Sequence, residues 1–396
     1  MDEVREAALR VAIVADLLEE RWPSMDLVAD MLLAHLPSTD GLTPALLRPR
    51  LELSAMTRLG RLAGVDRFVR RFVDYPNWLR TNAGNQYDVF HVIDHSYAHV
   101  ALALPPGRTI VTCHDADAFL PLVAPSLTSS RLPLALVRRI LSGLRAARHV
   151  VCPSAATRDE LLHYGIVDAD RTLVVPNGVH PACVPTPDRD ADDFIDQFLG
   201  TDTGTVDILH VGTCIGRKRI DRLLDIVAAT RSLEPRVRLL KAGGTLTGEQ
   251  WSRARALGLE SAIVPVPFLS PAQLAALYRR AAVVVSTSDR EGFGLPVVEA
   301  LACGTSVVAT DMPVFREVGG DAVRFAAPGD TDRWRVQVLA AIEESRSPER
   351  RPAARARNIA QGSRFSWHAY AQAMAGLYRA VGAEAIPDQA PLAAGA

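Results

Sequence analysis

The fold is decided by the stretch Asp289-Arg290-Glu291-Gly292-Phe293-Gly294-Leu295-Pro296-Val297-Val298-Glu299-Ala300. It follows an apolar, β-branched run at 282–287 and opens a helical pattern, so it predicts a strand, a tight loop and the start of a helix. Gly292 and Gly294 allow a sharp turn and a close approach to a ligand. Pro296 suits the first helical turn, where its missing N–H is no loss.

A helix start at the carboxyl end of a strand is a ready site for a phosphate or diphosphate, because free N–H groups and the positive dipole end meet there. Glu291 and Glu299 bracket this site. Carboxylates are poor neighbours for phosphate but good acceptors for sugar or ribose hydroxyls. The layout therefore predicts a nucleotide-sugar. The structural alternative is ordinary loop glycines with a solvated Glu299, but the proline and the helix stop at Gly304 favour the ligand site.

A second loop of the same kind begins at residue 211 and reads Val-Gly-Thr-Cys-Ile-Gly-Arg-Lys. Gly212 and Thr213 follow a strand-like run, and Arg217 and Lys218 are cations that can neutralise a leaving diphosphate without a metal. The whole chain contains two lysines, so a lysine at this position favours a function. The alternative is a basic helix start on the surface, but basic residues oppose the dipole at a helix N-terminus.

Length and composition indicate a globular protein of two or three domains, with 396 residues and 48% hydrophobic content. The 44 lysines and arginines nearly balance the 45 acidic residues, so no overall attraction to nucleic acid is expected. The five cysteines are widely spaced and are interpreted as reduced packing residues. No signal-like segment opens the sequence and no apolar run could span a bilayer, which predicts a cytoplasmic location.

Strand-like and helix-like segments alternate along most of the chain, as is typical of parallel sheets covered by helices on both faces. In a first block, the predicted elements are strands at 10–15, 89–93, 109–113, 149–152 and 172–175 and helices at 25–36 and 157–164. In a second block, they are strands at 206–213, 236–241, 262–268, 282–287, 306–309 and 322–325 and a helix at 220–230. The proline- and aspartate-rich run at 181–193 is interpreted as the region of the linker.

Two doubly wound α/β domains are therefore expected to face each other across a cleft, since ligands of such sheets bind at the carboxyl ends of the strands. The expected N-terminal domain spans 1–185, and the expected C-terminal domain spans 200–364. A helix at 365–382 is expected to cross back to the first domain. The tail at 383–396 is rich in alanine and proline and is expected to be disordered.

Three segments carry a family resemblance: E-G-F-G-L-P-x-x-E-A-x-A-C-G at 291–304, G-R-K at 216–218 and V-P-N-G-V at 175–179. They resemble retaining glycosyltransferases of family 4, strongly in the second domain and loosely in the first. The resemblance implies the GT-B fold of two Rossmann-like domains, a nucleoside-diphosphate sugar as donor in the second domain, an acceptor in the first, and no metal or other cofactor.

The resemblance also implies a role for each matching position of the donor site. These positions are Arg217 and Lys218 for the diphosphate, Glu291 for the hydroxyls of the donor sugar, Phe293, Gly294 and Leu295 for backbone N–H contacts, and Glu299 for the ribose.

In the first domain, polar residues follow two predicted strands. His114 comes directly after one of them, and similar enzymes place a histidine at such a strand end beside the transferred sugar, so His114 is the candidate for that role. The alternative is a loop histidine that binds local backbone. Asp94, His95 and Tyr97 end the other strand and are candidates for acceptor contacts. Trp22 replaces the glycines of many family members and is either a sugar-stacking platform or, as we favour, a packing residue.

Two patterns with metal-ligand spacing are interpreted as chance. Asp115-Ala116-Asp117 is a D-x-D motif, but Asp-x-Asp recurs at 168–170 and 188–190. His91, His95 and His99 have helical spacing, but His91 falls inside a predicted strand. No metal is predicted.

Arg58, Arg61, Arg67, Arg70 and Arg71 alternate with apolar residues. A basic amphipathic helix of this kind could rest on anionic lipid at the inner membrane face. A solvated helix with its apolar side on the core is the commoner explanation. Peripheral membrane contact is therefore kept as an alternative.

The sequence predicts a metal-independent, retaining hexosyltransferase whose acceptor is a hydroxyl of a glycan, lipid or small metabolite. The alternatives are a GT-B-fold nucleotide-sugar epimerase or phosphorylase, or a nucleotide-sugar-binding module without catalysis. The complete set of Arg217, Lys218, Glu291 and Glu299 argues against the last. Contacts to the donor base are expected near 266–269; the base, the sugar, the acceptor and the oligomeric state stay open.

Overall fold

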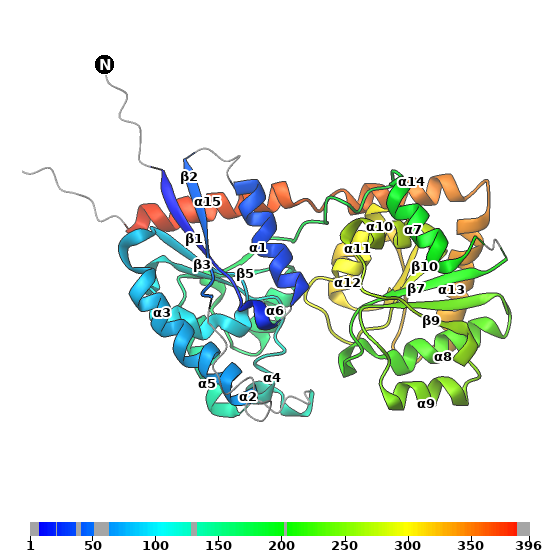
Figure 1. The fold of residues 1–396 in the computed structure, drawn as a ribbon, viewed down its shortest axis with the longest axis horizontal. Helices are drawn as coiled ribbons and strands as arrows, with labels where there is room; N and C mark the ends of the chain where they lie inside the picture. The colour runs from blue at the N-terminus through cyan, green and yellow to red at the C-terminus, as the bar shows by residue number, and fades with distance from the viewer. Residues whose placement is uncertain are drawn as a thin grey trace, which may run out of the picture. The chain divides into compact units, whose positions relative to one another are not determined.

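The computed structural model describes residues 8–20, 22–36, 41–50, 63–127, 133–201 and 204–385. Its contacts divide the chain into two compact units. Unit 1 consists of Met1–Asn177 together with Trp367–Ala396, and unit 2 consists of Gly178–Ser366. Each unit contains one six-stranded sheet in which every pairing is parallel (Figure 1).

The sheet of unit 1 has the strand order β2-β1-β3-β4-β5-β6. Its strands are β1 Leu9–Val14, β2 Leu42–Leu47, β3 Val89–Val92, β4 Thr109–Thr112, β5 His149–Cys152 and β6 Thr172–Val174. The α-helices of the unit are α1 Pro23–His35, α2 Ala63–Val69, α3 Tyr75–Asn82, α4 Leu120–Val123, α5 Leu134–Ala146, α6 Ala155–His163 and α15 Trp367–Ala385. A π-helical turn, η4 Arg70–Asp74, joins α2 to α3, and a 3-10 helix, η6 His95–Ala103, follows β3.

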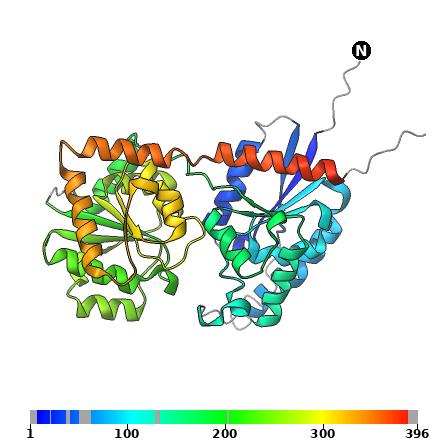
Figure 2. The same cartoon turned by 180° about the vertical axis from the view of Figure 1, so that it is seen from behind.

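Helices cover both faces of this sheet. In β1, Val11 and Ile13 belong to one apolar cluster, with side chains of α1 and α15, whereas Ala12 and Val14 belong to another, with side chains of α3 and η6. Successive side chains of a strand point to opposite faces, so a strand that is apolar at every position needs a helix layer on each side. The helix α15 lies against α1 and beside β1 and β3 (Figure 1, Figure 2).

The sheet of unit 2 has the strand order β12-β11-β10-β7-β8-β9. Its strands are β7 Val206–Val211, β8 Val237–Ala242, β9 Ile263–Pro265, β10 Val283–Ser286, β11 Val307–Thr310 and β12 Val323–Ala326. Its α-helices are α7 Arg189–Leu199, α8 Ile220–Arg231, α9 Gly248–Ala256, α10 Pro271–Arg280, α11 Leu295–Ala302, α12 Pro313–Gly319, α13 Thr331–Arg346 and α14 Arg351–Gly362. Side chains of α8 and α13 form one apolar cluster with β7, β8 and β10.

Strand order reverses once in each sheet. In unit 1 the reversal lies between β1 and β3, and in unit 2 it lies between β7 and β10. Loops that leave two such strands run in opposite directions, which opens a crevice at the carboxyl edge where doubly wound sheets bind their ligands. The topology therefore singles out four loops: those after β1 and β3, and those after β7 and β10.

Most predicted elements agree with the structure to within two residues at each end, and the exceptions have physical reasons. Strand β2 was missed because Pro44 interrupts its pattern; an edge strand tolerates a residue without an N–H. Strand β9 is shorter than predicted, since Pro265 and Pro267 cannot donate to a ladder.

Two predictions about connecting segments need correction. Residues 189–193, assigned to the linker, form the first turn of α7, where the Asp188 side chain caps the helix by accepting from the Ala191 N–H at 3.1 Å. Residues 383–385, assigned to the tail, are the last residues of α15. The rest of the predicted tail, 386–396, lies outside the described residues.

Gly143 on α5 provides a test of the packing in unit 1. A Cβ at this position would lie 2.0 Å from the main-chain oxygen of Ala98 in η6. We expect Gly143→Ala to destabilise the protein by about 1–3 kcal/mol, because backbone must move to make room. The control is Gly376→Ala on α15, where a Cβ meets nothing within 4 Å and helix propensity predicts a gain of up to about 1 kcal/mol. Equal unfolding free energies for the two variants in urea would contradict this packing.

Candidate functional site

Glu291 is the centre of a polar cluster at the reversal point of unit 2. Lys218 Nζ forms an ion pair with Glu291 Oε1, and Arg217 Nη1 lies 3.0 Å from Oε2. Ser288 Oγ donates to Oε1 at 2.7 Å. Arg217 also donates to the main-chain oxygen of Arg290 at 2.9 Å. The cations come from the loop after β7 and the carboxylate from the loop after β10, so this cluster joins the two loops that the topology singles out.

The environment of Glu291 keeps it ionised. Burial raises the pKa of this carboxyl, but the charges of Lys218 and Arg217 and the hydrogen bonds from Lys218 and Ser288 outweigh burial, so its pKa lies below the usual value. The surface-helix alternative for Arg217 and Lys218 does not hold, because their side chains are only 23% and 12% exposed.

The start of α11 has the features of an anion site. Gly294 caps the helix in the left-handed region, with φ of +90°, and Pro296 lies in the first turn. Within the part of the chain that the structure describes, the N–H groups of Phe293, Gly294 and Leu295 have no hydrogen-bond acceptor. A Cβ at Gly294 would lie 2.8 Å from the ring of Phe315, so packing as well as conformation requires glycine.

Glu299 is buried in α11 and is not the solvated residue of the structural alternative. Tyr278 donates its hydroxyl hydrogen to Glu299 Oε2 at 2.9 Å. Burial raises the pKa of Glu299, and the Tyr278 hydrogen bond opposes that rise only in part. The other carboxyl oxygen is therefore the one that a hydroxyl-bearing ligand could contact.

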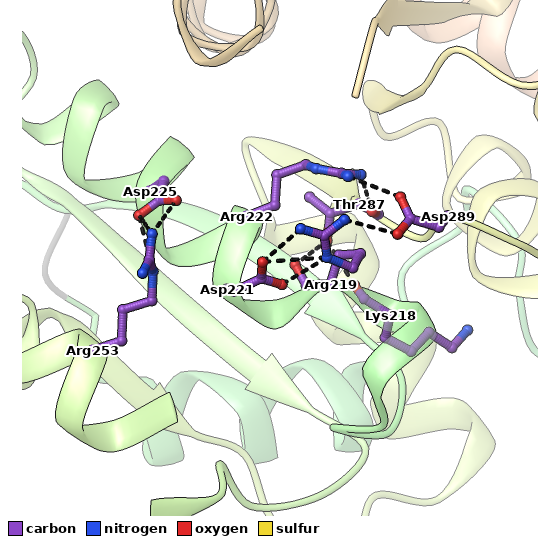
Figure 3. A network of polar contacts seen from close by, with 8 residues as sticks. All are labelled: Lys218, Arg219, Asp221, Arg222, Asp225, Arg253, Thr287 and Asp289. Atoms are coloured by element: carbon purple, nitrogen blue, oxygen red, sulfur yellow. Dashed lines mark hydrogen bonds and ion pairs between the residues drawn. The ribbon is translucent and has the colours of Figure 1, made fainter. Parts of the chain in front are cut away.

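Asp289 anchors the loop after β10 to the start of α8 (Figure 3). Arg219 Nη1 and Arg222 Nη2 each lie 2.8 Å from one of its two carboxylate oxygens. Arg222 also donates to the main-chain oxygen of Thr287 at 2.9 Å. Arg219 adopts a left-handed conformation, with φ of +50°, between the 3-10 turn that contains Lys218 and the start of α8.

Two basic residues near the ends of β7 and β8 were not assigned by sequence reasoning. Lys241 in β8 is buried, and its ammonium donates to the main-chain oxygens of Gly212 at 2.5 Å and Ala242 at 2.8 Å. A Cβ at Gly243 would lie 2.8 Å from that same Gly212 oxygen, so the backbones that leave β7 and β8 approach each other closely here. His210 is buried beside these groups, and burial followed by the charges of Lys241 and Lys218 lowers its pKa. The rarity of lysine in this chain was the signal that could have identified Lys241.

In unit 1, the structure brings His95, Asp94 and His114 together at the reversal point. His95 Nδ1 lies 3.2 Å from Asp94 Oδ1, and its Nε2 lies 3.3 Å from Asp115 Oδ1. Burial alone would lower the pKa of His95, but hydrogen bonds to Asp115 and Asp94 outweigh it and raise the pKa to about 10. His114 Nε2 donates to the main-chain oxygen of Ile93 at 2.8 Å, and burial lowers the pKa of its imidazole. His114 therefore binds local backbone through one nitrogen, as its structural alternative predicted.

Asp16 was missed by sequence reasoning. It follows β1, and the parallel register Val14↔Val92 places it level with Asp94, which follows β3. Its side chain is buried, and neither carboxyl oxygen has a hydrogen-bond partner among the described residues. Burial, followed by the charge of Asp94, raises the pKa of Asp16 well above its usual range. The signal in the sequence was a lone acid directly after the first strand.

Two of the proposed acceptor residues, Tyr97 and Trp22, pack against an arginine. The guanidinium carbon of Arg71 lies 4.3 Å from the ring centre of Tyr97 and 5.7 Å from that of Trp22. The hydroxyl of Tyr97 donates to Glu20 Oε1 at 3.2 Å, and the ring is buried. Tyr97 is therefore a packing residue, whereas Trp22 remains 36% exposed.

The arginine-rich segment is only partly a surface feature. Arg70 is buried between Asp66 and Glu19, at 2.9 and 3.2 Å, and Arg71 donates to the main-chain oxygen of Ser96 at 2.5 Å. Arg67 is exposed, and Arg58 and Arg61 lie outside the described residues.

The two metal-like patterns do not converge on a common point. His91 contacts the hydroxyls of Tyr378 and Thr112, each at 2.7 Å, whereas His99 contacts the main-chain oxygen of Arg71. Across the described ranges, no group of three or more histidine, cysteine, aspartate or glutamate side chains is placed to hold a metal. A search of the same ranges finds no helix with the length and apolar character needed to cross a membrane.

Asp16→Asn tests the buried carboxyl. Because folding raises the pKa of Asp16, the native state holds the proton more tightly than the unfolded chain, and the wild type loses stability as pH rises above about 3.9 toward the native pKa. Asparagine does not titrate. We therefore expect the unfolding free energy of the variant, relative to wild type, to increase by about 1.4 kcal/mol per pH unit within that window.

The groups that face Asp16 are Asp94, Arg71, Arg48 and Tyr75. Urea unfolding at pH 4.5 and pH 7 gives the measurement, with the exposed Asp168→Asn as the control that should parallel wild type. If the unfolding free energies of Asp16→Asn and wild type change equally between pH 4.5 and pH 7, the Asp16 carboxyl titrates normally.

Two family models match this chain. The model for glycosyl transferases group 1 matches residues 191–359, and that for glycosyltransferase family 4 matches residues 41–182. A D-inositol 3-phosphate glycosyltransferase of Segniliparus rotundus is 32% identical over 64% of this chain and 58% of that protein. A GDP-mannose:cellobiosyl-diphosphopolyprenol alpha-mannosyltransferase of Komagataeibacter xylinus is 31% identical over 64% of this chain and 61% of that protein. The matches thus span about three fifths of the length of these relatives.

Solved structures agree with the fold. Sucrose-phosphate synthase from Thermosynechococcus elongatus has a TM-score of 0.71 at 19% identity and covers 95% of this chain and all of that one. The Anabaena protein HepE, in complex with UDP and glucose, has a TM-score of 0.72 at 19% identity and covers 94% of this chain and all of that one. With two GT-B-type sheets and both family models matched along most of its length, this chain belongs to the family 4, group 1 glycosyltransferases.

Proposed function

We propose that this chain is a retaining, metal-independent hexosyltransferase that uses a nucleoside-diphosphate sugar. The observation that carries the proposal is the convergence of two cations and an open helix start at the reversal point of unit 2. Arg217, Lys218 and the start of α11 would stabilise the negative charge that grows on the leaving diphosphate. These groups supply the charge compensation that a metal supplies elsewhere.

The carboxylates support a front-side reaction. Retention through a covalent intermediate needs a carboxylate free to attack the opposite face of the sugar. Glu291 is held by two cations and Glu299 by Tyr278, so neither is placed as a free nucleophile. In the proposed step, the bond between C1 of the sugar and the phosphate oxygen breaks with its electrons moving to the phosphate. The acceptor oxygen bonds to C1 on the same face and its proton passes to the departing phosphate.

Glu291 would have two tasks in this step. Its carboxylate holds Arg217 and Lys218 beside each other, which their like charges would otherwise oppose. It would also accept hydrogen bonds from the sugar hydroxyls. Glu299 would accept from the ribose through the carboxyl oxygen that Tyr278 leaves open.

The relatives suggest which substrates to try. Their names include GDP-mannose and inositol 3-phosphate, and the HepE structure contains UDP and glucose. We propose a gluco- or manno-configured hexose carried on UDP or GDP, with Asp94, His95 and His114 of unit 1 near the acceptor. A peripheral membrane contact would use α2, where Arg67 lies beside the exposed Val65.

A donor panel tests the proposal. UDP-glucose, UDP-galactose, GDP-mannose and GDP-glucose are each incubated with the protein, with and without candidate acceptors, and nucleoside diphosphate release is measured. We expect Lys218→Ala and Glu291→Gln to lower turnover of the accepted donor by about 10²- to 10³-fold, because each removes part of the charge array around the leaving group.

Glu260→Gln, an exposed acid after α9, is the matched control and should retain wild-type turnover. NMR of the product distinguishes the alternatives: retention at C1 in a new glycoside supports the proposal. Isomerised donor would indicate an epimerase, and a phosphate-dependent reaction would indicate a phosphorylase. If both Lys218→Ala and Glu291→Gln keep wild-type turnover, the assignment of these residues to the site is wrong.

A further inference from the structure

Unit 2 has a cavity at the amino edge of its sheet, the edge opposite the donor loops. It has a volume of about 440 Å³. Residues that precede strands line it, among them Thr205 before β7, Ala282 before β10 and Ser306 before β11. Because all strands of this sheet are parallel, residues that precede them share one edge. The end of α10 and the start of α14 complete the wall.

Positive charge predominates in this cavity. Five arginines and two aspartates line it, which are Arg279, Arg280, Arg346, Arg351, Arg355, Asp196 and Asp207. Arg280 is compensated by both aspartates, and Arg346 forms an ion pair with Glu234 at 3.2 Å. Arg279 is paired with Asp192, so Arg351 and Arg355 carry the positive charge that no carboxylate among the described residues balances.

Arg355 carries a charge that no carboxylate balances in the described part of the chain. Its two terminal nitrogens donate to the main-chain oxygens of Cys303 at 3.2 Å and Pro185 at 2.6 Å. The side chain packs over Gly304, where a Cβ would lie 2.8 Å from Arg355 Cγ. Main-chain carbonyls and a glycine thus hold this guanidinium in place while leaving it cationic.

Arg279 lies next to Arg355. Its Nη1 donates to the main-chain oxygen of Val184 at 3.3 Å. Because Val184 directly precedes Pro185, the guanidinium groups of Arg279 and Arg355 donate to consecutive main-chain carbonyls. Arg279 is paired with Asp192 at 2.6 Å, but its buried Nε has no hydrogen-bond acceptor among the described residues. The side chain is only 9% exposed, so leaving this donor unpaired is costly.

Helix α14 adds to the positive field. Its first turn contains no acidic residue, and the Ser347 hydroxyl that accepts from the Arg350 N–H at 3.2 Å is neutral, so the positive end of the helix dipole is not compensated by a charge there. Arg351 lies in that turn, one helical turn before Arg355, and its exposed side chain has no partner within the described ranges. Cations at a helix N-terminus are unfavourable unless an anion neutralises them.

We propose that this amino-edge arginine cavity binds a phosphate-bearing small molecule through Arg279, Arg351 and Arg355. Guanidinium groups match phosphate oxygens in pairs, and the hydroxyls of Thr201 and Ser306 on the same wall can donate further hydrogen bonds. The site is separate from the donor site, because the strands of the sheet lie between the two edges. The competing explanation is that the arginines only fasten the segment at 184–185 to the rest of unit 2.

Isothermal titration with inorganic phosphate, at constant ionic strength, tests the proposal. The measurement uses Lys218→Ala, which weakens anion binding at the donor loops and leaves the cavity intact. We expect this protein to bind phosphate, and the added Arg351→Ala to weaken that binding about tenfold, as expected for the loss of one charge-assisted contact. Because Arg351 is exposed and unpartnered, its replacement should leave the unfolding midpoint without phosphate unchanged.

Arg189→Ala on α7, whose side chain is 92% exposed, is the matched control and should bind phosphate like the parent. Arg355→Lys keeps the charge but loses the paired geometry, and it should also weaken binding. The proposal is overturned if Lys218→Ala takes up no phosphate or if Arg351→Ala binds it as tightly as the parent. If the parent binds no phosphate and Arg355→Lys is less stable than the parent, the arginines only fasten the segment at 184–185.

Discussion

The arrangement of unit 2 depends on one interaction, the carboxylate of Glu291, 10% exposed, which is shared by Arg217 and Lys218. A buried carboxylate is costly unless it is paired, and two neighbouring cations repel each other unless an anion lies between them. The cluster satisfies both requirements at once. It also links the loops after β7 and β10, which strand order sends in opposite directions. The same cations that stabilise the loops are thereby held where a diphosphate would need them.

The two units use the same topology with different chemistry. In unit 1, Asp94 and Asp115 flank His95 and raise its pKa to about 10, and Asp16 lies level with Asp94, whereas unit 2 presents cations and an open helix start. An acid-rich site suits hydroxyl groups, which donate hydrogen bonds, and a cationic site suits phosphate. This division of charge is consistent with an acceptor hydroxyl in one unit and a nucleotide diphosphate in the other.

Much of the fold followed from local patterns, because parallel strands that are buried on both faces leave continuous β-branched runs in the sequence. Elements without that signal were missed: β2 contains a proline, and the first turn of α7 resembles a linker rich in aspartate. The loops after β7 and β10 were predictable because glycine follows each strand, and glycine and proline mark the start of α11. The contact between Tyr97 and Arg71 was not predictable, since spacing alone does not show which polar side chains turn inward.

By itself, the sequence determined the alternation of strands and helices and the types of residue in the loops after β7 and β10, because both are encoded over a few adjacent positions. Only the tertiary structure decided which loops meet. Strand order places the loop after β7 beside the loop after β10, 73 residues apart at Lys218 and Glu291. Register likewise sets Asp16 beside Asp94, and packing decides that Lys241, Glu299 and Arg355 are held by partners distant in the chain. Burial and charge balance arise from such distant contacts, and no local pattern contains them.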